Sequence, residues 1–189
     1  HLHQLPIIKQ ILEQNGITIT IPKNLGRAFH HGQILGCEYT GPKLIEHDID
    51  AYVSIANQFH TMGLALSTNK PVILVDPVHE TITELKGLKE QTMKKRYSLL
   101  EQARHAHSFG IIISTKSGQI NNALAENLHH KILSHQKEAV IIIMNEIKPD
   151  QLLNFNVDAY VSTACPRVAI EDQPRYNKPI LTVKELLAV

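Results

Sequence analysis

The sequence contains no tryptophan, only two cysteines, no long apolar run and no block of like charge. Two cysteines in 189 residues exclude a disulfide-rich scaffold. Lysine and arginine total 19 against 18 acidic residues, a net charge of +1, so no basic stripe marks a nucleic-acid-binding protein. The longest apolar runs, such as residues 139–144, have the length of a strand and cannot span a membrane. The remaining composition, 43% hydrophobic and 20% charged, is typical of a globular protein.

Short β-branched segments alternate with helical patterns along the whole chain. Most of these segments are apolar on both faces, which is typical of a parallel sheet covered by helices on each side. Strands are predicted at residues 17–21, 51–55, 72–75, 111–113, 140–144, 159–162 and 180–183. Helices are predicted at residues 5–14, 85–107, 118–134 and 149–153. This alternation predicts the α/β class.

An internal repeat divides the chain into two similar units. The peptide DAYVS at residues 50–54 recurs at 158–162, and NKP at 69–71 recurs at 177–179, both with an offset of 108 residues. We therefore predict a first α/β domain over residues 1–107, including a connecting helix over about 85–107, and a second over 108–189. The second unit opens with a strand ahead of its long helix, whereas the first opens directly with a helix. We expect the first unit to lack its leading strand, and a strand to lie upstream of His1 in a longer protein.

Both cysteines follow predicted strands, and parallel sheets carry their functional loops at the carboxyl ends of strands. Cys165 lies three residues after the strand at 159–162, and Cys37 lies in the long loop after 17–21. The two are not equivalent in the repeat, but pseudo-symmetric packing would allow their loops to meet in one cleft. Two inert, buried cysteines are the structural alternative. No C-x-x-C pattern indicates thioredoxin chemistry, and the usual radical cluster motif is absent.

An ordered series of motifs resembles the archaeal diphthamide synthase family, the 2-(3-amino-3-carboxypropyl)histidine synthases. The motifs are GQILGC (32–37), FHTMGLAL (59–66), DP (76–77), KRY (95–97), FGIIISTKSGQ (109–119) and ACPR (164–167). The resemblance implies three similar α/β domains, each of which gives one cysteine to a [4Fe–4S] cluster. Cys37 and Cys165 would be the ligands from the middle and C-terminal domains, and the first ligand would belong to a domain that this chain lacks. Residues 54–58 depart from the family, which usually carries glycines there.

The activity implied by the resemblance is the first step of diphthamide biosynthesis. Three thiolates would leave one iron of the cluster open, as three protein ligands leave a catalytic zinc open. S-adenosylmethionine would be cleaved at its Cγ–S bond in a radical reaction. Its 3-amino-3-carboxypropyl group would pass to a histidine of translation elongation factor 2. A cytoplasmic homodimer with no nucleic-acid or membrane partner is expected.

Four further residues are candidates for binding S-adenosylmethionine. Arg167 lies two residues from Cys165, and its guanidinium fork fits a carboxylate; the alternative is a salt bridge to a nearby acid, Glu171 or Asp172. Lys116 and Gln119 are expected at the N-terminus of the helix near residue 118, a favourable place for an anion, although Lys116 could equally be a solvated charge. His60 is a candidate to line the cleft, against a purely structural role.

Other polar residues carry weaker predictions. Asp76 either forms a turn or contributes an acid to the cleft. Histidines that are adjacent or two apart on a helix point to different faces and cannot chelate a metal together, so surface or capping roles are expected for them.

A non-catalytic role is the competing hypothesis. The chain would then be a partner subunit or binding module that supports the iron–sulfur cluster of another subunit. The presence of both Cys37 and Cys165 favours the enzyme.

Overall fold

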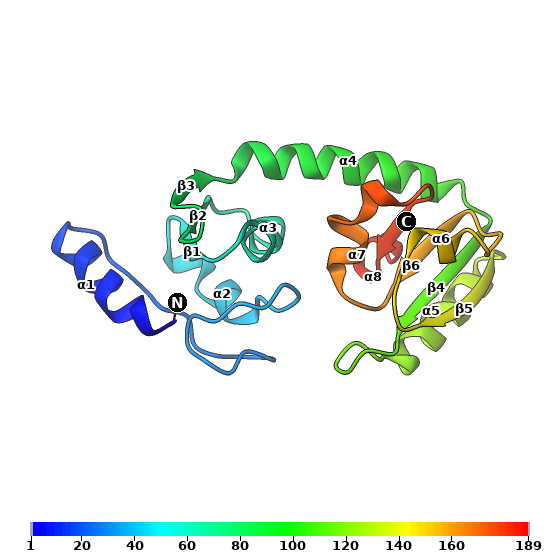
Figure 1. The fold of residues 1–189 in the computed structure, drawn as a ribbon, viewed down its shortest axis with the longest axis horizontal. Helices are drawn as coiled ribbons and strands as arrows, with labels where there is room; N and C mark the ends of the chain where they lie inside the picture. Colours follow the sequence, from blue (N-terminus) through cyan, green and yellow to red (C-terminus); the bar gives the residue numbers. More distant parts are fainter. Residues whose placement is uncertain (1, 189) are drawn as a thin grey trace. The chain divides into compact units, whose positions relative to one another are not determined.

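The computed structural model describes residues 2–188 and divides into two compact units, His1–Thr92 and Met93–Val189 (Figure 1). Each unit is a small sheet with helices beside it, which confirms the α/β class. The division falls inside the long helix α4 (Lys86–Arg104). The domain boundary expected from the sequence lies further along, at residues 107–108. The second half of α4 groups with the second unit, in keeping with the burial of Ala103 in that unit's core.

The first unit is built on a three-stranded sheet in the order β1-β2-β3. Strands β1 (Tyr52–Ile55) and β2 (Val72–Asp76) are parallel, and the unexpected β3 (Thr81–Glu84) is antiparallel to β2. The core gathers Tyr52, Met62, Leu64, Ala65, Val72, Leu74 and Leu85. The helical segments are η1 (Leu2–Gln4), α1 (Leu5–Gln14), α2 (Thr40–Leu44), η2 (Glu46–Asp48) and α3 (Gln58–Ser67). Of these, α3 was not among the helices predicted from the sequence.

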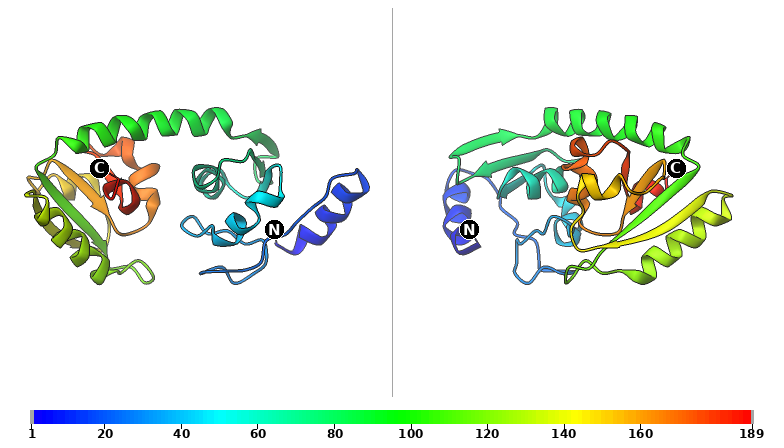
Figure 2. Two further views of the ribbon diagram at one scale, coloured as in Figure 1. Left: turned by 180° about the vertical axis from the view of Figure 1, so that it is seen from behind. Right: turned by 45° about the vertical axis from the view of Figure 1, so that its right-hand side comes forward.

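The second unit is built on a four-stranded parallel sheet in the order β5-β4-β6-β7. The central strand β4 buries successive isoleucines on opposite faces, Ile111 and Ile113 in one cluster and Ile112 in the other. Helices α4 and α5 contribute to the first cluster and α6 and α7 to the second, so both faces are covered (Figure 2). The elements are β4 (Ser108–Ser114), α5 (Asn122–Ser134), β5 (Glu138–Met144), α6 (Pro149–Leu152), β6 (Ala159–Ser162), α7 (Pro166–Ile170), η3 (Gln173–Arg175), β7 (Ile180–Thr182) and α8 (Val183–Leu186).

The repeat seen in the sequence is also a repeat in structure. Tyr52 of β1 pairs in register with Val72, and Tyr160 of β6 pairs with Ile180, 108 residues further on in each case. Each tyrosine hydroxyl donates to a backbone carbonyl of the preceding short helix, Tyr52 to Pro42 O at 2.7 Å and Tyr160 to Leu152 O at 2.6 Å. The same offset relates the starts of α3 and α7, at Gln58 and Pro166.

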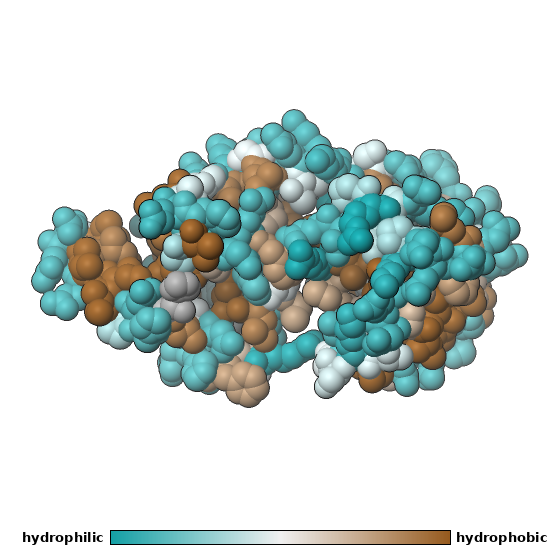
Figure 3. All heavy atoms as spheres, viewed as in Figure 1, coloured by the Kyte–Doolittle hydropathy of each residue, from teal (hydrophilic) through white to brown (hydrophobic). Residues whose placement is uncertain are grey.

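Among residues 2–92, the first unit shows no counterpart of β4, as expected. Strand β6 pairs with β4 on the side away from β7, whereas within residues 2–188 β1 pairs only with β2. Moving Gly110–Ser114 of β4 back by 108 positions leads to residues 2–6, which form η1 and the start of α1. Helix α1 accordingly has no buried residue, with Ile7 61% and Ile11 53% exposed, and its apolar side chains show on the surface (Figure 3).

The strand predicted at residues 17–21 does not form, and this prediction is wrong. In the second unit, the strand that follows α5 is β5, which pairs only with β4. The residues after α1 have no such neighbour among the described residues. A β-branched segment without a partner strand cannot satisfy its backbone groups as a sheet does.

Candidate functional site

Cys37 lies at the tip of a tight turn formed by residues 35–38. Glu38 N donates to Leu35 O at 3.1 Å and Leu35 N to Glu38 O at 3.4 Å, and the thiol side chain is exposed and makes no disulfide. The turn rests on the first turn of α3, because a Cβ added at Gly36 would collide with the ring of Phe59. Glycine at position 36 is therefore what lets the backbone of the turn approach the helix so closely.

Cys165 is the N-cap residue of α7 and is partly exposed. The segment before it is fixed to the sheet, because Thr163 donates both its N–H and its hydroxyl to Ile112 O at 3.0 Å. After it, Pro166 occupies the first helical position, and Val168 N donates to Cys165 O at 3.1 Å. This cysteine thus sits where β6 ends and α7 begins.

The two cysteines lie beside repeat-equivalent helices, although their sequence positions do not correspond. Cys165 stands at the N-terminal end of α7, and the repeat equivalent of α7 is α3, whose N-terminal turn carries Phe59 beneath the Cys37 turn. The position equivalent to Cys165 in the first unit is Asn57, the N-cap of α3. The second unit therefore carries its cysteine at the helix cap, whereas the first unit carries it in a loop that packs against the first turn of the helix.

Asn57 also orients His60. Its Oδ1 accepts from His60 N at 3.2 Å and lies 2.8 Å from His60 Nδ1. The amide oxygen of Asn57 can only accept, so Nδ1 of His60 is the donor in this contact. Asn57 was not among the residues singled out from the sequence. An Asn three residues before the backbone N–H that it caps is a start signal of a helix, and this spacing could have indicated Asn57 as the N-cap.

Arg167 is paired with Glu171, the alternative considered from the sequence. Its Nε lies 3.2 Å from Glu171 Oε2, and its side chain is 57% exposed. Burial raises the pKa of Glu171, and the positive charge of Arg167 partly opposes this rise. A role of Arg167 in binding a carboxylate ligand remains a prediction.

Lys116 and Gln119 do not lie at a helix N-terminus, and that expectation is wrong. The helix predicted from residue 118 begins at Asn122, and its cap is Asn121, which accepts from Leu124 N at 3.1 Å. Lys116 and Gln119 instead close a turn through Gln119 N and Lys116 O at 3.0 Å. The delay is consistent with Gly118, whose φ of +76° is not helical.

The remaining acidic and histidine candidates have local roles. Asp76 accepts from Val78 N at 2.9 Å and His79 N at 3.2 Å, so it forms a turn, and its hydrogen bonds with His79 lower the pKa of its carboxyl. Within residues 2–188, no group of three or more histidine, cysteine, aspartate or glutamate residues could hold a metal ion. No helix in that part of the chain is long and apolar enough to cross a membrane.

Comparison with known proteins places the chain in a family. A family model described as "Putative diphthamide synthesis protein" matches residues 1–189. The chain belongs to the diphthamide synthesis protein family. The sequence is 35% identical over 186 residues to the 2-(3-amino-3-carboxypropyl)histidine synthase of Pyrococcus horikoshii, covering 98% of this chain and 53% of that protein. It is 33% identical over 157 residues to subunit 1 of the Kluyveromyces lactis enzyme, covering 82% of this chain and 37% of that protein.

Solved structures of this family show the same fold. The crystal structure of Dph2 from Pyrococcus horikoshii matches with a TM-score of 0.87 at 33% identity, covering 100% of this chain and 54% of that one. The crystal structure of the same protein with a 4Fe-4S cluster matches with a TM-score of 0.86, at the same identity and coverage. The chain thus spans about half the length of its Pyrococcus relative.

Proposed function

We propose that this chain is the part of a 2-(3-amino-3-carboxypropyl)histidine synthase that supplies Cys37 and Cys165 as ligands of a [4Fe–4S] cluster. The observation that carries the proposal is that both cysteines lie beside repeat-equivalent helices. Cys165 caps α7, and Gly36, next to Cys37, packs against Phe59 in the first turn of α3. Membership of the family, and a relative whose structure is described with a 4Fe-4S cluster, support the same assignment.

The donor set of the chain fits such a cluster in part. Iron–sulfur clusters are held by cysteine thiolates, and both cysteines are free, accessible and outside the apolar cores. Each is presented by a segment whose backbone is fixed by hydrogen bonds, which favours a defined ligand geometry. The sequence contains two cysteines, so a third thiolate has to come from outside these 189 residues.

When bound, the cluster supplies the electron that breaks the Cγ–S bond of S-adenosylmethionine. The residues of this chain bind and orient the reactants. Arg167 binds the carboxylate of the aminocarboxypropyl group, which replaces Glu171 as the partner of its exposed guanidinium. His60, Lys116 and Gln119 are the further candidates for contacts with S-adenosylmethionine.

The acceptor is a histidine of translation elongation factor 2, and methylthioadenosine is the second product. The complete protein acts as a cytoplasmic homodimer in this proposal. The competing hypothesis, a non-catalytic subunit that supports the cluster of another chain, is consistent with relatives that are named as a subunit 1.

The proposal is tested on the complete gene product, purified and reconstituted with iron and sulfide under anaerobic, reducing conditions. Cys37→Ser and Cys165→Ser should each lower the visible absorbance of the cluster and abolish methylthioadenosine formation. The matched control is Asn145→Ser, which changes the repeat equivalent of Cys37 without touching a thiol. Retention of cluster and turnover by both cysteine variants would contradict the assignment. Activity that needs a second, different chain would favour the subunit hypothesis.

The chain of 189 residues provides a second test. With two thiolates, it should hold a cluster weakly and form no methylthioadenosine with elongation factor 2. Adding the region that carries the third cysteine should restore both properties. Robust turnover by the 189 residues alone would mean that the third ligand is not a cysteine of the same protein.

A further inference from the structure

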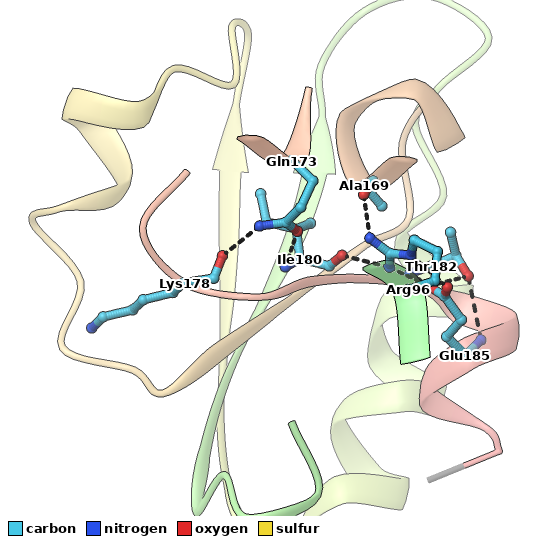
Figure 4. Close-up of polar contacts among 7 residues, drawn as sticks. All are labelled: Arg96, Ala169, Gln173, Lys178, Ile180, Thr182 and Glu185. Carbon is cyan, nitrogen blue, oxygen red and sulfur yellow. Dashed lines mark hydrogen bonds and ion pairs between the residues drawn. The ribbon is translucent and has the colours of Figure 1, made fainter. Parts of the chain in front are cut away.

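A charged side chain on α4 is buried in the second unit. Arg96 is 7% exposed, and its guanidinium makes four hydrogen bonds to three separate segments (Figure 4). Nη1 donates to Ala169 O of α7 at 2.5 Å and Nη2 to Ile180 O of β7 at 3.0 Å. Nε and Nη2 donate to the two carboxylate oxygens of Glu185 in α8 at 2.8 and 2.6 Å. These are four different acceptor oxygens, one more than the three N–H donors of a lysine ammonium could serve, so the contacts need the guanidinium fork.

Glu185 is also held by hydrogen bonds to a residue other than Arg96. Its Oε2 accepts from Thr182 N at 2.8 Å and Thr182 Oγ1 at 2.9 Å, which completes a capping box at the start of α8. Burial acts to raise the pKa of Glu185, but hydrogen bonding and charge from Arg96, with the Thr182 hydrogen bonds, lower it overall. The pair is therefore ionic near neutral pH, and the carboxylate sets the orientation of the guanidinium.

The acceptor in β7 is fixed as well. Gln173 accepts from Ile180 N at 2.7 Å and donates to Lys178 O at 3.1 Å, which holds the start of β7 against η3 (Figure 4). Buried ion pairs contribute little net stability, because removing two charges from water costs about as much as their attraction returns. A conformational role is the better account of this network.

The remaining hydrogen bond of Arg96 reaches the helix that Cys165 caps. Ala169 lies near the end of α7, where carbonyl groups have no partner within the helix, and it is completely buried. A helix of five residues has little stability of its own, so its position depends on what holds its ends. The hydrogen bond from Thr163 to Ile112 O holds the segment at the N-terminal end of α7. The hydrogen bond from Arg96 to Ala169 O holds the C-terminal end.

We propose that Arg96, oriented by Glu185, is a positioning residue that fixes the Cys165 turn through α7. Cys165 and Ala169 are four residues apart, which is a backbone rise of about 6 Å, or about one turn of helix. Loss of the guanidinium contact frees that end of α7 and lets the turn at Cys165 open more often. The consequence for an iron–sulfur cluster rests on the proposed function; the positioning of the thiol does not.

The experiment measures the alkylation rates of Cys165 and Cys37 by iodoacetamide in the folded 189-residue chain, resolved by mass spectrometry. Arg96→Lys keeps the charge but cannot serve all four acceptor oxygens, and it should raise the Cys165 rate about threefold or more and leave the Cys37 rate unchanged. Glu185→Gln should give a smaller rise in the same direction, and it provides a second variant if Arg96→Lys fails to fold. The matched control is Arg104→Gln, an exposed arginine of the same helix paired with Glu101.

A rise confined to Cys165 in the Arg96 and Glu185 variants supports the proposal. Equal rises at both cysteines would indicate general loosening and overturn it, as would unchanged rates. In the complete, cluster-loaded protein, Arg96→Lys should shift the electron paramagnetic resonance signal of the cluster. If Cys165→Ser leaves the cluster intact while the alkylation effect is present, the proposed function fails and the positioning role stands. If Cys165→Ser removes the cluster while the alkylation effect is absent, the proposed function stands and the positioning role of Arg96 fails.

Discussion

A methyl group added to Gly110 should destabilise the second unit measurably. Gly110 lies in the central strand β4, in register with Tyr160 of β6 and Val140 of β5. A Cβ there would lie 2.7 Å from Tyr160 Cδ1 and 2.9 Å from Ile142 Cδ1. Both distances are well below the optimal carbon–carbon separation of about 3.5–4.0 Å.

The size of the effect depends on whether the neighbours can move. The Tyr160 ring is held by the hydrogen bond of its hydroxyl to Leu152 O at 2.6 Å, so it cannot turn away without losing that bond. Overpacking of a core costs about 1–3 kcal/mol, and a hydrogen bond about 1 kcal/mol. We expect Gly110→Ala to lower the free energy of unfolding by about 2–3 kcal/mol, with a fall in Tm of roughly 4–8 °C per kcal/mol for a unit of this size.

Urea denaturation measures this change, with two comparisons. Gly87→Ala, in α4, meets no atom within 4 Å of the new Cβ and should be neutral or stabilising by up to about 1 kcal/mol. Ile142→Val removes the Cδ1 atom that the new methyl group meets, so it should cost less in the Gly110→Ala background than in the wild type. A Gly110→Ala protein as stable as the wild type would refute the reasoning, because the sheet would then have room for a Cβ at position 110, which the short distances to Tyr160 and Ile142 exclude.

Three further changes test local interactions. Tyr160→Phe should cost about 1–2 kcal/mol in urea denaturation, because it removes the donor to Leu152 O in a buried site; an unchanged midpoint would contradict this. Asn57→Ala should cost about 1 kcal/mol through loss of the α3 cap, with Asn57→Asp as the variant that keeps an acceptor and most of the stability. Hydrogen bonds from the backbone of His107 and Ser108 lower the pKa of the Asp158 carboxyl, so its stabilisation is complete above the unfolded pKa of about 4 and is lost as pH falls through the lower folded value. Asp158→Asn should therefore flatten the loss of stability below about pH 4, and an unaltered acid profile would count against that assignment.

The sequence by itself determined the α/β class, the repeat and most of the strand positions. The 108-residue offset carried Tyr52 onto Tyr160, and the structure gives both tyrosines the same register and the same hydrogen bond to a preceding helix. These features follow from local apolar patterns and turn residues, which the sequence displays directly. The absence of a counterpart of β4 from residues 2–92 could be predicted for the same reason, because comparing the two copies of a repeat shows which element one of them does not contain.

Tertiary structure alone decided the elements whose stability comes from distant partners. Residues 17–21 alternate isoleucine and threonine as a strand does, yet they form none, because a strand needs a neighbour and the described chain offers none there. Strand β3 shows the opposite case: its four residues are exposed and carry no buried alternation, and they form a strand through pairing with β2.

The candidate site divides in the same way. Cys165 could be singled out from its place after the strand at 159–162, which forms as β6. The strand predicted before Cys37 does not form, so only the family resemblance singles out that cysteine. The glycine-dependent contact of the Cys37 turn with Phe59 could not be found in the sequence, nor could the bonding of Arg96 to Glu185 across 89 residues. Both depend on which backbone surfaces meet after folding, and no local pattern encodes a contact between segments so far apart in the chain.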